Sequence, residues 1–160
     1  ECPLTPEAKN WFDHDKKKMT QFEFASFIES GQLEITSPTG AEMLEIASTL
    51  HAKNAVNFRS GIRLDNGQTQ FTYNEQIEGS AGTQGQLTIP TEITLALRMF
   101  RGDAEAWPLK ANFRYRVAEG KLQMWYELVR PHIIKDLAIA EVIKQIKATY
   151  PSTLLVESVL

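Results

Sequence analysis

Apolar side chains in the first fifty residues recur every three or four positions, which is the period of an amphipathic helix. The first helix is expected to begin after Thr5, because a threonine hydroxyl caps a helix start and Pro6 fits its first position. Trp11 and Phe12 then provide its apolar contacts. The lysine run 16–18 that follows is more typical of a solvated helix end than of a nucleic-acid patch.

Two further helices are expected in this region. Thr20 and Glu23 have the spacing of a capping box, in which the hydroxyl and the carboxylate each satisfy a free backbone N–H. Gly31 ends this second helix, since glycine readily adopts the backbone conformation of a helix C-terminus. A third helix opens near Thr39 or Gly40. Its expected apolar face comprises Met43, Leu44, Ile46, Ala47 and Leu50.

From Ala55 onward the apolar pattern alternates, which indicates strands. Asn66-Gly67 is a strong signal for a two-residue hairpin turn, because both turn residues must take positive φ. One side of this first hairpin is expected to face the core and the other to be polar. The expected core-side pairs are Leu64 with Thr69, Ile62 with Phe71 and Ser60 with Tyr73, and the polar-side pairs are Arg63 with Gln70, Gly61 with Thr72 and Arg59 with Asn74.

A second hairpin is predicted by alternating apolar residues over 109–117 and 122–128, on either side of a turn at 119–120. Upstream, the apolar residues of 87–99 fall on odd positions, so this stretch is a strand or a pair of strands that Pro90 interrupts or borders. In the second hairpin the expected inner pairs are Val117 with Leu122, Tyr115 with Met124 and Phe113 with Tyr126, and the outer pairs are Arg116 with Gln123 and Arg114 with Trp125.

The C-terminal region is expected to be helical between Pro131, which closes the sheet, and Pro151. The tail 154–160 is a candidate last strand. The apolar stripe of the helix comprises Ile133, Leu137, Ala140, Ile143 and Ile146. The order of elements favours an α+β fold, in which the N-terminal helices and the C-terminal helix pack on one face of an antiparallel β-sheet.

With 160 residues and 42% hydrophobic content, the chain is expected to form a single domain over residues 1–160. It begins without an initiator methionine, which suggests the C-terminal part of a longer chain. Cys2 is its one cysteine, so an intramolecular disulfide and a thiolate metal cluster are excluded. No apolar run is long enough to span a bilayer, and we therefore expect no membrane association and a cytoplasmic location.

The net charge of −3 argues against a protein that coats duplex DNA, since neutralising phosphates needs a basic excess. If the two hairpins are neighbours, however, their polar faces share a surface that could hold phosphates and stack a base. This predicted nucleic-acid or nucleotide-binding surface comprises Arg59, Arg63, Arg114, Arg116 and Trp125. The alternative is that each arginine pairs with a cross-strand acid and that Arg114 covers Trp125 through a cation–π contact.

Trp125 falls on the polar face of its strand, so a helix, another subunit or a ligand must cover it. We favour another subunit, and hence a homo-oligomer, because tryptophan is enriched in protein interfaces.

Catalysis has little support in the sequence. The three histidines, His14, His51 and His132, have no regular spacing from one another or from acids, and no zinc motif is present. Glu42 and Glu45 have helical spacing, which is typical of solvated acids. We therefore expect no enzymatic activity, no catalytic residues, no cofactor and no metal site.

Five stretches of the chain resemble the YfdQ-like proteins of phages and prophages, a family with a domain of unknown function. The stretches are NWFDHD (10–15), QFEFASFIE (21–29), FRSGIRLDNGQTQFTY (58–73), GQLTIP (85–90) and GKLQMWYELVRPH (120–132). The resemblance implies an accessory protein in the cytoplasm of the bacterial host cell, without an established enzymatic activity.

Two functional hypotheses follow. The first is a non-enzymatic, self-assembling phage accessory protein, in which the outer sheet face and Trp125 contribute to subunit contacts. The alternative is a nucleic-acid or nucleotide-binding module for phage recombination or counter-defence, which would use the arginine surface.

Overall fold

The computed structural model describes the backbone of residues 2–63, 69–81 and 87–152, and the side chains of residues 2–51, 81 and 87–152. Within these ranges it has four α-helices and a five-stranded antiparallel sheet, which confirms the predicted α+β class. The helices are α1 (Pro6–Asp13), α2 (Gln21–Ser30), α3 (Gly40–Thr49) and α4 (Pro131–Thr149), with a short 3₁₀ helix η1 (Gln32–Glu34) between α2 and α3. The strands of the sheet, in spatial order, are β1 (Met19–Thr20), β7 (Lys121–Leu128), β6 (Trp107–Ala118), β5 (Glu92–Leu97) and β2 (Ile35–Ser37).

The second hairpin, β6–β7, has the predicted register at every expected pair. Val117 lies opposite Leu122 and Phe113 lies opposite Tyr126, while Trp125 lies opposite Arg114. Alternation sets this register, because a shift by one residue would turn every apolar side chain to the solvent. The break near Pro90 is also confirmed, since β5 begins only at Glu92.

The first hairpin is present as β3 (His51–Arg63) and β4 (Thr69–Ser80), but its predicted register is wrong. Arg63 pairs with Thr69 and Arg59 with Thr72, instead of with Gln70 and Asn74. The pairing shifts again between Arg59 and Ile62, where the ladder has an irregularity of the kind that a β-bulge produces. The predicted turn at Asn66-Gly67 lies outside the described residues.

The three N-terminal helices begin where their caps were predicted. The Thr5 hydroxyl accepts the Ala8 N–H at the start of α1, and Thr20 and Thr39 each form a capping box with the glutamate three residues on. Gly31 is the C-terminal cap of α2. These starts depend on contacts within one turn of helix, which is why sequence spacing was sufficient to place them.

Acid is expected to weaken these two capping boxes. Glu23 and Glu42 each accept hydrogen bonds from the backbone N–H and hydroxyl of their capping threonine, which lower the pKa of both carboxyls. A carboxyl with a lowered folded-state pKa stabilises the fold above its unfolded pKa of about 4.3 and loses this effect as pH falls through the folded value. We expect the pH dependence of unfolding below about pH 4.5 to become shallower when Glu23→Gln and Glu42→Gln are combined. Thermal unfolding between about pH 7 and pH 2.5 measures it, and an unchanged slope would contradict the assignment.

The core lies between the inner face of the sheet and helices α1–α3. Trp11 is 1% exposed, and its ring packs edge-on against Phe27 and Tyr126, with ring centroids 4.8 and 5.1 Å away. The Tyr126 hydroxyl donates to the Trp11 backbone carbonyl at 2.7 Å, and burial raises the pKa of this tyrosine. This cluster joins α1 and α2 to the middle of β7.

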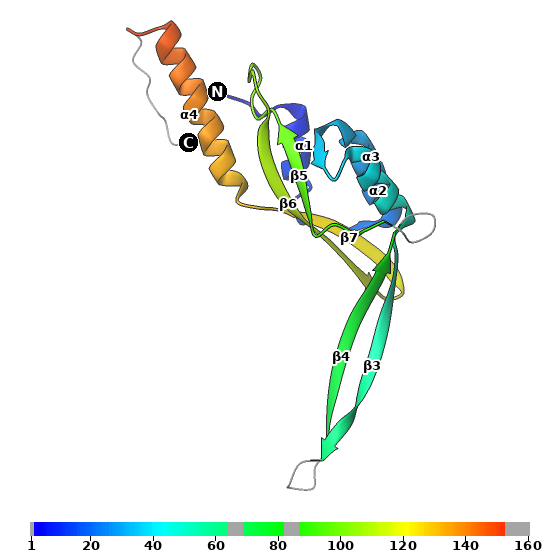
Figure 1. Ribbon diagram of the computed structural model, residues 1–160. Helices are drawn as coiled ribbons and strands as arrows, with labels where there is room; N and C mark the ends of the chain where they lie inside the picture. Colours follow the sequence, from blue (N-terminus) through cyan, green and yellow to red (C-terminus); the bar gives the residue numbers. More distant parts are fainter. Residues whose placement is uncertain (1, 64–68, 82–86, 153–160) are drawn as a thin grey trace.

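Helix α4 begins at Pro131 as predicted but buries a different side from the expected one. Leu137 and Ile143, on the predicted stripe, are 50% and 37% exposed, whereas Ala138 is fully buried and Val142 packs against the core. Apolar residues occupy both sides of this helix, so their period does not distinguish the covered side. In Figure 1, α4 and the α2–α3 pair lie on opposite sides of β5 and β6, not on one face. The predicted strand 154–160 lies outside the described residues.

The hairpin β3–β4 forms a two-stranded sheet of its own and extends away from the body of the molecule (Figure 1). None of the helices within the described ranges combines the length and the apolar character needed to cross a bilayer.

Candidate functional site

The outer face of β6–β7 carries three of the five residues predicted to bind nucleic acid. Arg114 and Arg116 project from β6 and Trp125 from the neighbouring β7. The Arg116 Nε donates to the Gln123 side-chain oxygen at 2.9 Å, and the indole N–H of Trp125 donates to Glu127 at 3.1 Å. These side chains are therefore held by cross-strand and same-strand neighbours.

Glu127 also faces Arg114, with 3.6 Å between the guanidinium Nε and a carboxylate oxygen. The two side chains are 46% and 35% exposed, so this ion pair contributes little to stability. It nevertheless matches the cross-strand pairing that was the alternative to a phosphate site. The cation over Trp125 is different from the expected one, because the Lys18 ammonium, not Arg114, lies 5.7 Å from the ring centroid.

The two hairpins belong to different sheets, although β3 and β6 approach each other. Arg59 and Arg63 lie on β3, whereas β6 and β7 are flanked by β5 and β1. Strand β5 covers the edge of β6 over 107–112 and β1 covers the edge of β7 at 123–124, and in the described backbone β3 pairs with neither strand of the second hairpin. The side chains of Arg59 and Arg63 lie outside the described residues, so their predicted role in binding stays a prediction.

The structure brings Lys18 to Trp125 and places the lysine run beside Phe22. Strand β1 pairs Met19 with Met124, and the preceding Lys18 comes to lie beside Trp125 at the edge of the sheet. Lys17, Lys18 and the exposed Phe22 line one hollow of about 420 Å³. Sequence reasoning treated the lysine run as a helix end and did not single out Phe22. The sequence held one indication of Phe22, which is a large apolar residue outside the buried stripe of α2.

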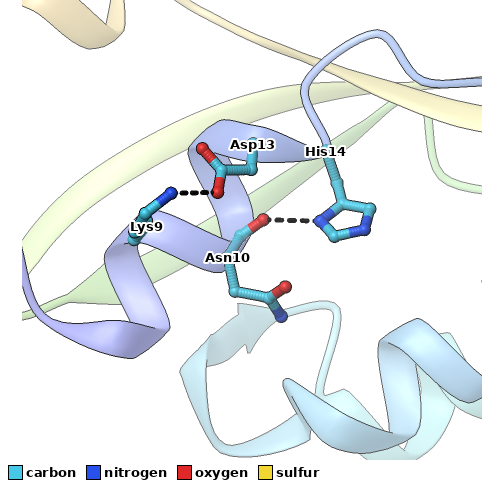
Figure 2. A network of polar contacts seen from close by, with 4 residues as sticks. All are labelled: Lys9, Asn10, Asp13 and His14. Carbon is cyan, nitrogen blue, oxygen red and sulfur yellow. Dashed lines mark hydrogen bonds and ion pairs between the residues drawn. The ribbon is translucent and has the colours of Figure 1, made fainter.

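His14 lies at the rim of this hollow, in a small polar network that ends α1 (Figure 2). Its Nδ1 is 2.9 Å from the Asn10 carbonyl, which can only accept, so Nδ1 carries the proton of this hydrogen bond. Lys9 forms an ion pair with Asp13 on the same helix. The His14 ring also packs on Phe27, with ring centroids 4.9 Å apart. These contacts fix the orientation of the ring.

The other candidates for chemistry are dispersed. The carboxylate of Glu42 caps α3 by accepting from the Thr39 N–H and hydroxyl, at 2.8 Å each, so it is engaged in a structural role. Among the described side chains, those of residues 2–51, 81 and 87–152, no three His, Cys, Asp or Glu are grouped closely enough to hold a metal ion.

Comparison with protein families places the chain. The family model described as "Uncharacterized conserved protein (DUF2303)" matches residues 1–156. The chain belongs to the DUF2303 family. No curated protein and no solved structure gave a match.

Membership of the DUF2303 family agrees with the expected domain of unknown function. This family match does not itself show a relation to the YfdQ-like phage proteins. For this DUF2303 protein, function has therefore to be inferred from surfaces, and two of them stand out: the exposed side of α4 and the hollow beside Lys18.

Proposed function

We propose that this protein is a non-enzymatic phage or prophage accessory protein that assembles with further copies of itself through helix α4. The phage connection and the cytoplasmic location rest on the resemblance of five sequence stretches to YfdQ-like proteins. The assembly rests on one observation, which is the row of large apolar side chains on the exposed side of α4.

That row consists of Ile133, Leu137 and Ile143, which are 41%, 50% and 37% exposed. Helical neighbours are three or four residues apart, so these side chains follow one side of α4, with the small Ala140 between them. Complete burial of a leucine or isoleucine side chain contributes about 1.5–3 kcal/mol. Covering this row in a partner interface would therefore stabilise an assembly.

A second copy of α4, lying antiparallel and centred on Ala140, is the occupant that this side fits best. Such a pair places Leu137 opposite Ile143 of the second copy and Asp136 opposite its Lys144. The two-fold axis repeats both contacts, so one carboxylate meets one ammonium on each side of the axis. Lys144 is 3.2 Å from Glu141 of its own helix, but at 77% and 41% exposure this ion pair is weak and can be exchanged.

The β3–β4 hairpin provides a second, independent argument for assembly. An isolated two-stranded hairpin is marginally stable in water and gains stability from further strands or from packing. In this molecule the hairpin is a two-stranded sheet that extends from the body (Figure 1). Contacts with further copies would supply the missing packing.

The proposal predicts concentration-dependent association of the full chain in sedimentation or light scattering. Leu137→Lys is expected to raise the dissociation constant by about 10- to 100-fold, because the pair buries the exposed half of Leu137 in both copies, which together is worth about 1.5–3 kcal/mol. The matched control is Leu33→Lys, since Leu33 is 95% exposed and lies outside α4. A chain that stays monomeric at tens of micromolar would contradict the proposal.

A charge exchange tests the antiparallel arrangement. Asp136→Lys places an ammonium opposite Lys144 and is expected to weaken association. Adding Lys144→Asp to the same chain restores an opposite-charge pair in the two-fold arrangement and is expected to recover most of the loss. If the double variant associates no better than Asp136→Lys, α4 does not pair in this way.

A further inference from the structure

We propose that the hollow beside the lysine run binds single-stranded nucleic acid, with Phe22 as a stacking surface for a base and Lys17 and Lys18 as phosphate contacts. This site goes beyond self-assembly and is independent of α4. It also differs from the arginine surface expected from the sequence, because it lies at the β1 edge of the five-stranded sheet.

Phe22 is the most unusual apolar residue in this region. It lies in the first turn of α2 and is 81% exposed, whereas Phe24, Phe27 and Ile28 of the same helix are buried. Its ring borders a hollow of about 420 Å³, which is in the range of small-molecule sites. The floor of that hollow includes Met19 and Phe27. An aromatic ring beside such a hollow can stack on a planar base.

The lysines beside Phe22 are carried by a turn that the sheet holds in place. The Lys16 N–H donates to the Tyr126 carbonyl at 2.9 Å, and the Lys17 N–H donates to the His14 carbonyl at 3.1 Å. The Asp15 carboxylate accepts the Leu128 N–H at 2.8 Å. The exposed ammonium groups thus extend from a backbone with fixed contacts to β7, which lowers the cost of ordering them on a ligand.

The acids nearby are already engaged. Glu23 accepts from the Thr20 N–H and hydroxyl at 2.8 and 2.9 Å, and Asp13 pairs with Lys9. Glu23 also lines the hollow, and its carboxylate is attracted electrostatically to the Lys17 ammonium. These acids therefore reduce the local positive potential, although in the part of the chain that the structure describes none of them lies within ion-pair distance of the lysine run. The Lys18 ammonium lies over the Trp125 ring, 5.7 Å from its centroid.

The chemistry favours a single strand over a duplex. The face of an aromatic side chain can stack only on a base that is unpaired or extruded. The lysine run supplies too few cations to coat a duplex, and the net charge of −3 adds no general attraction to DNA. Its ammonium groups suit a few phosphates of a flexible strand. A peptide partner would contact Phe22 only as an apolar side chain, so leucine could replace it. A comparison of Phe22→Leu with Phe22→Trp therefore distinguishes a peptide from a nucleic acid.

The test is fluorescence anisotropy of a labelled oligothymidine of about 15 nucleotides, titrated with the full chain between about 50 and 200 mM salt. We expect binding that weakens with salt, and weaker binding of a duplex of equal length. Phe22→Leu is expected to lower affinity by about 10-fold or more without changing the salt slope, whereas Phe22→Trp retains affinity. The combined Lys17→Gln and Lys18→Gln variant is expected to reduce the salt slope by about 1 to 1.5.

Lys110→Gln is the control for an exposed lysine elsewhere, and Leu33→Ala is the control for an exposed apolar residue. Both are expected to bind like the unchanged protein. Absence of binding at low salt would overturn the proposal, as would equal loss with Lys110→Gln or full affinity in Phe22→Leu. Because Phe22 is exposed, its variants are expected to unfold at the same temperature as the unchanged protein, and a shared loss of folding and binding would count against a direct contact.

Discussion

Replacing Trp11 with alanine is expected to lower the free energy of unfolding by about 3–5 kcal/mol. The indole is 1% exposed and fills the space between α1, α2 and β7. Its loss removes ring contacts with Phe27 and Tyr126 and leaves a cavity that neighbouring side chains can fill only in part. Among the described core side chains, Trp11 carries the largest ring, and this ring contacts both α2 and β7.

Urea denaturation of the full chain measures this effect. Trp11→Phe is expected to lose less than Trp11→Ala, because a phenyl ring keeps part of the contact area. Phe22→Ala is the matched control, since it removes an aromatic side chain that is 81% exposed, and we expect a change within about 0.5 kcal/mol. A loss below about 1 kcal/mol for Trp11→Ala would show that this cluster does not hold the core together.

Gly40→Ala is expected to destabilise the protein by about 1–3 kcal/mol, although alanine is the better helix former. A Cβ at this position would lie 2.2 Å from the backbone oxygen of Gln32 and 2.9 Å from its carbonyl carbon. The backbone of η1 cannot rotate out of the way as a side chain could, so α3 and η1 would have to move apart. The predicted sign is thus opposite to the sign that helix propensity predicts.

The same denaturation experiment tests this substitution. Ser48→Ala is the control, because Ser48 lies on the exposed side of the same helix and should change stability by no more than about 0.5 kcal/mol. If Gly40→Ala proved neutral or stabilising, the close approach of α3 to η1 would be wrong.

The predictions that succeeded depend on residues close in the chain. Helix starts at Thr20 and Thr39 follow from capping contacts three residues apart, and the β6–β7 register follows from alternation around a short turn. The register of β3–β4 failed although its turn signal was strong. The pairing already differs from the prediction at Arg63 and Thr69, the pair nearest the turn, and it shifts again between Arg59 and Ile62. Alternation and a turn signal do not identify an irregularity of this kind in the ladder.

The candidate site was predicted only in part. Arg114 and Trp125 were placed correctly on the outer face of the second hairpin, and the cross-strand pairing considered as an alternative is the one observed for Arg114. Lys18 was not recognised as a neighbour of Trp125, nor Phe22 as a neighbour of the lysine run. They come together only because Met19 and Thr20 add a short edge strand to β7.

Residue order and spacing were thus sufficient for the class of fold, the capped helices and one complete hairpin, because these depend on interactions within a few residues. The separation of β3–β4 from the main sheet, the buried side of α4 and the meeting of Lys18 with Trp125 arise from packing between distant segments. Such packing depends on which strand edges remain free and which apolar sides find a partner. Several arrangements satisfy the same local pattern, and burial across the whole molecule selects one of them.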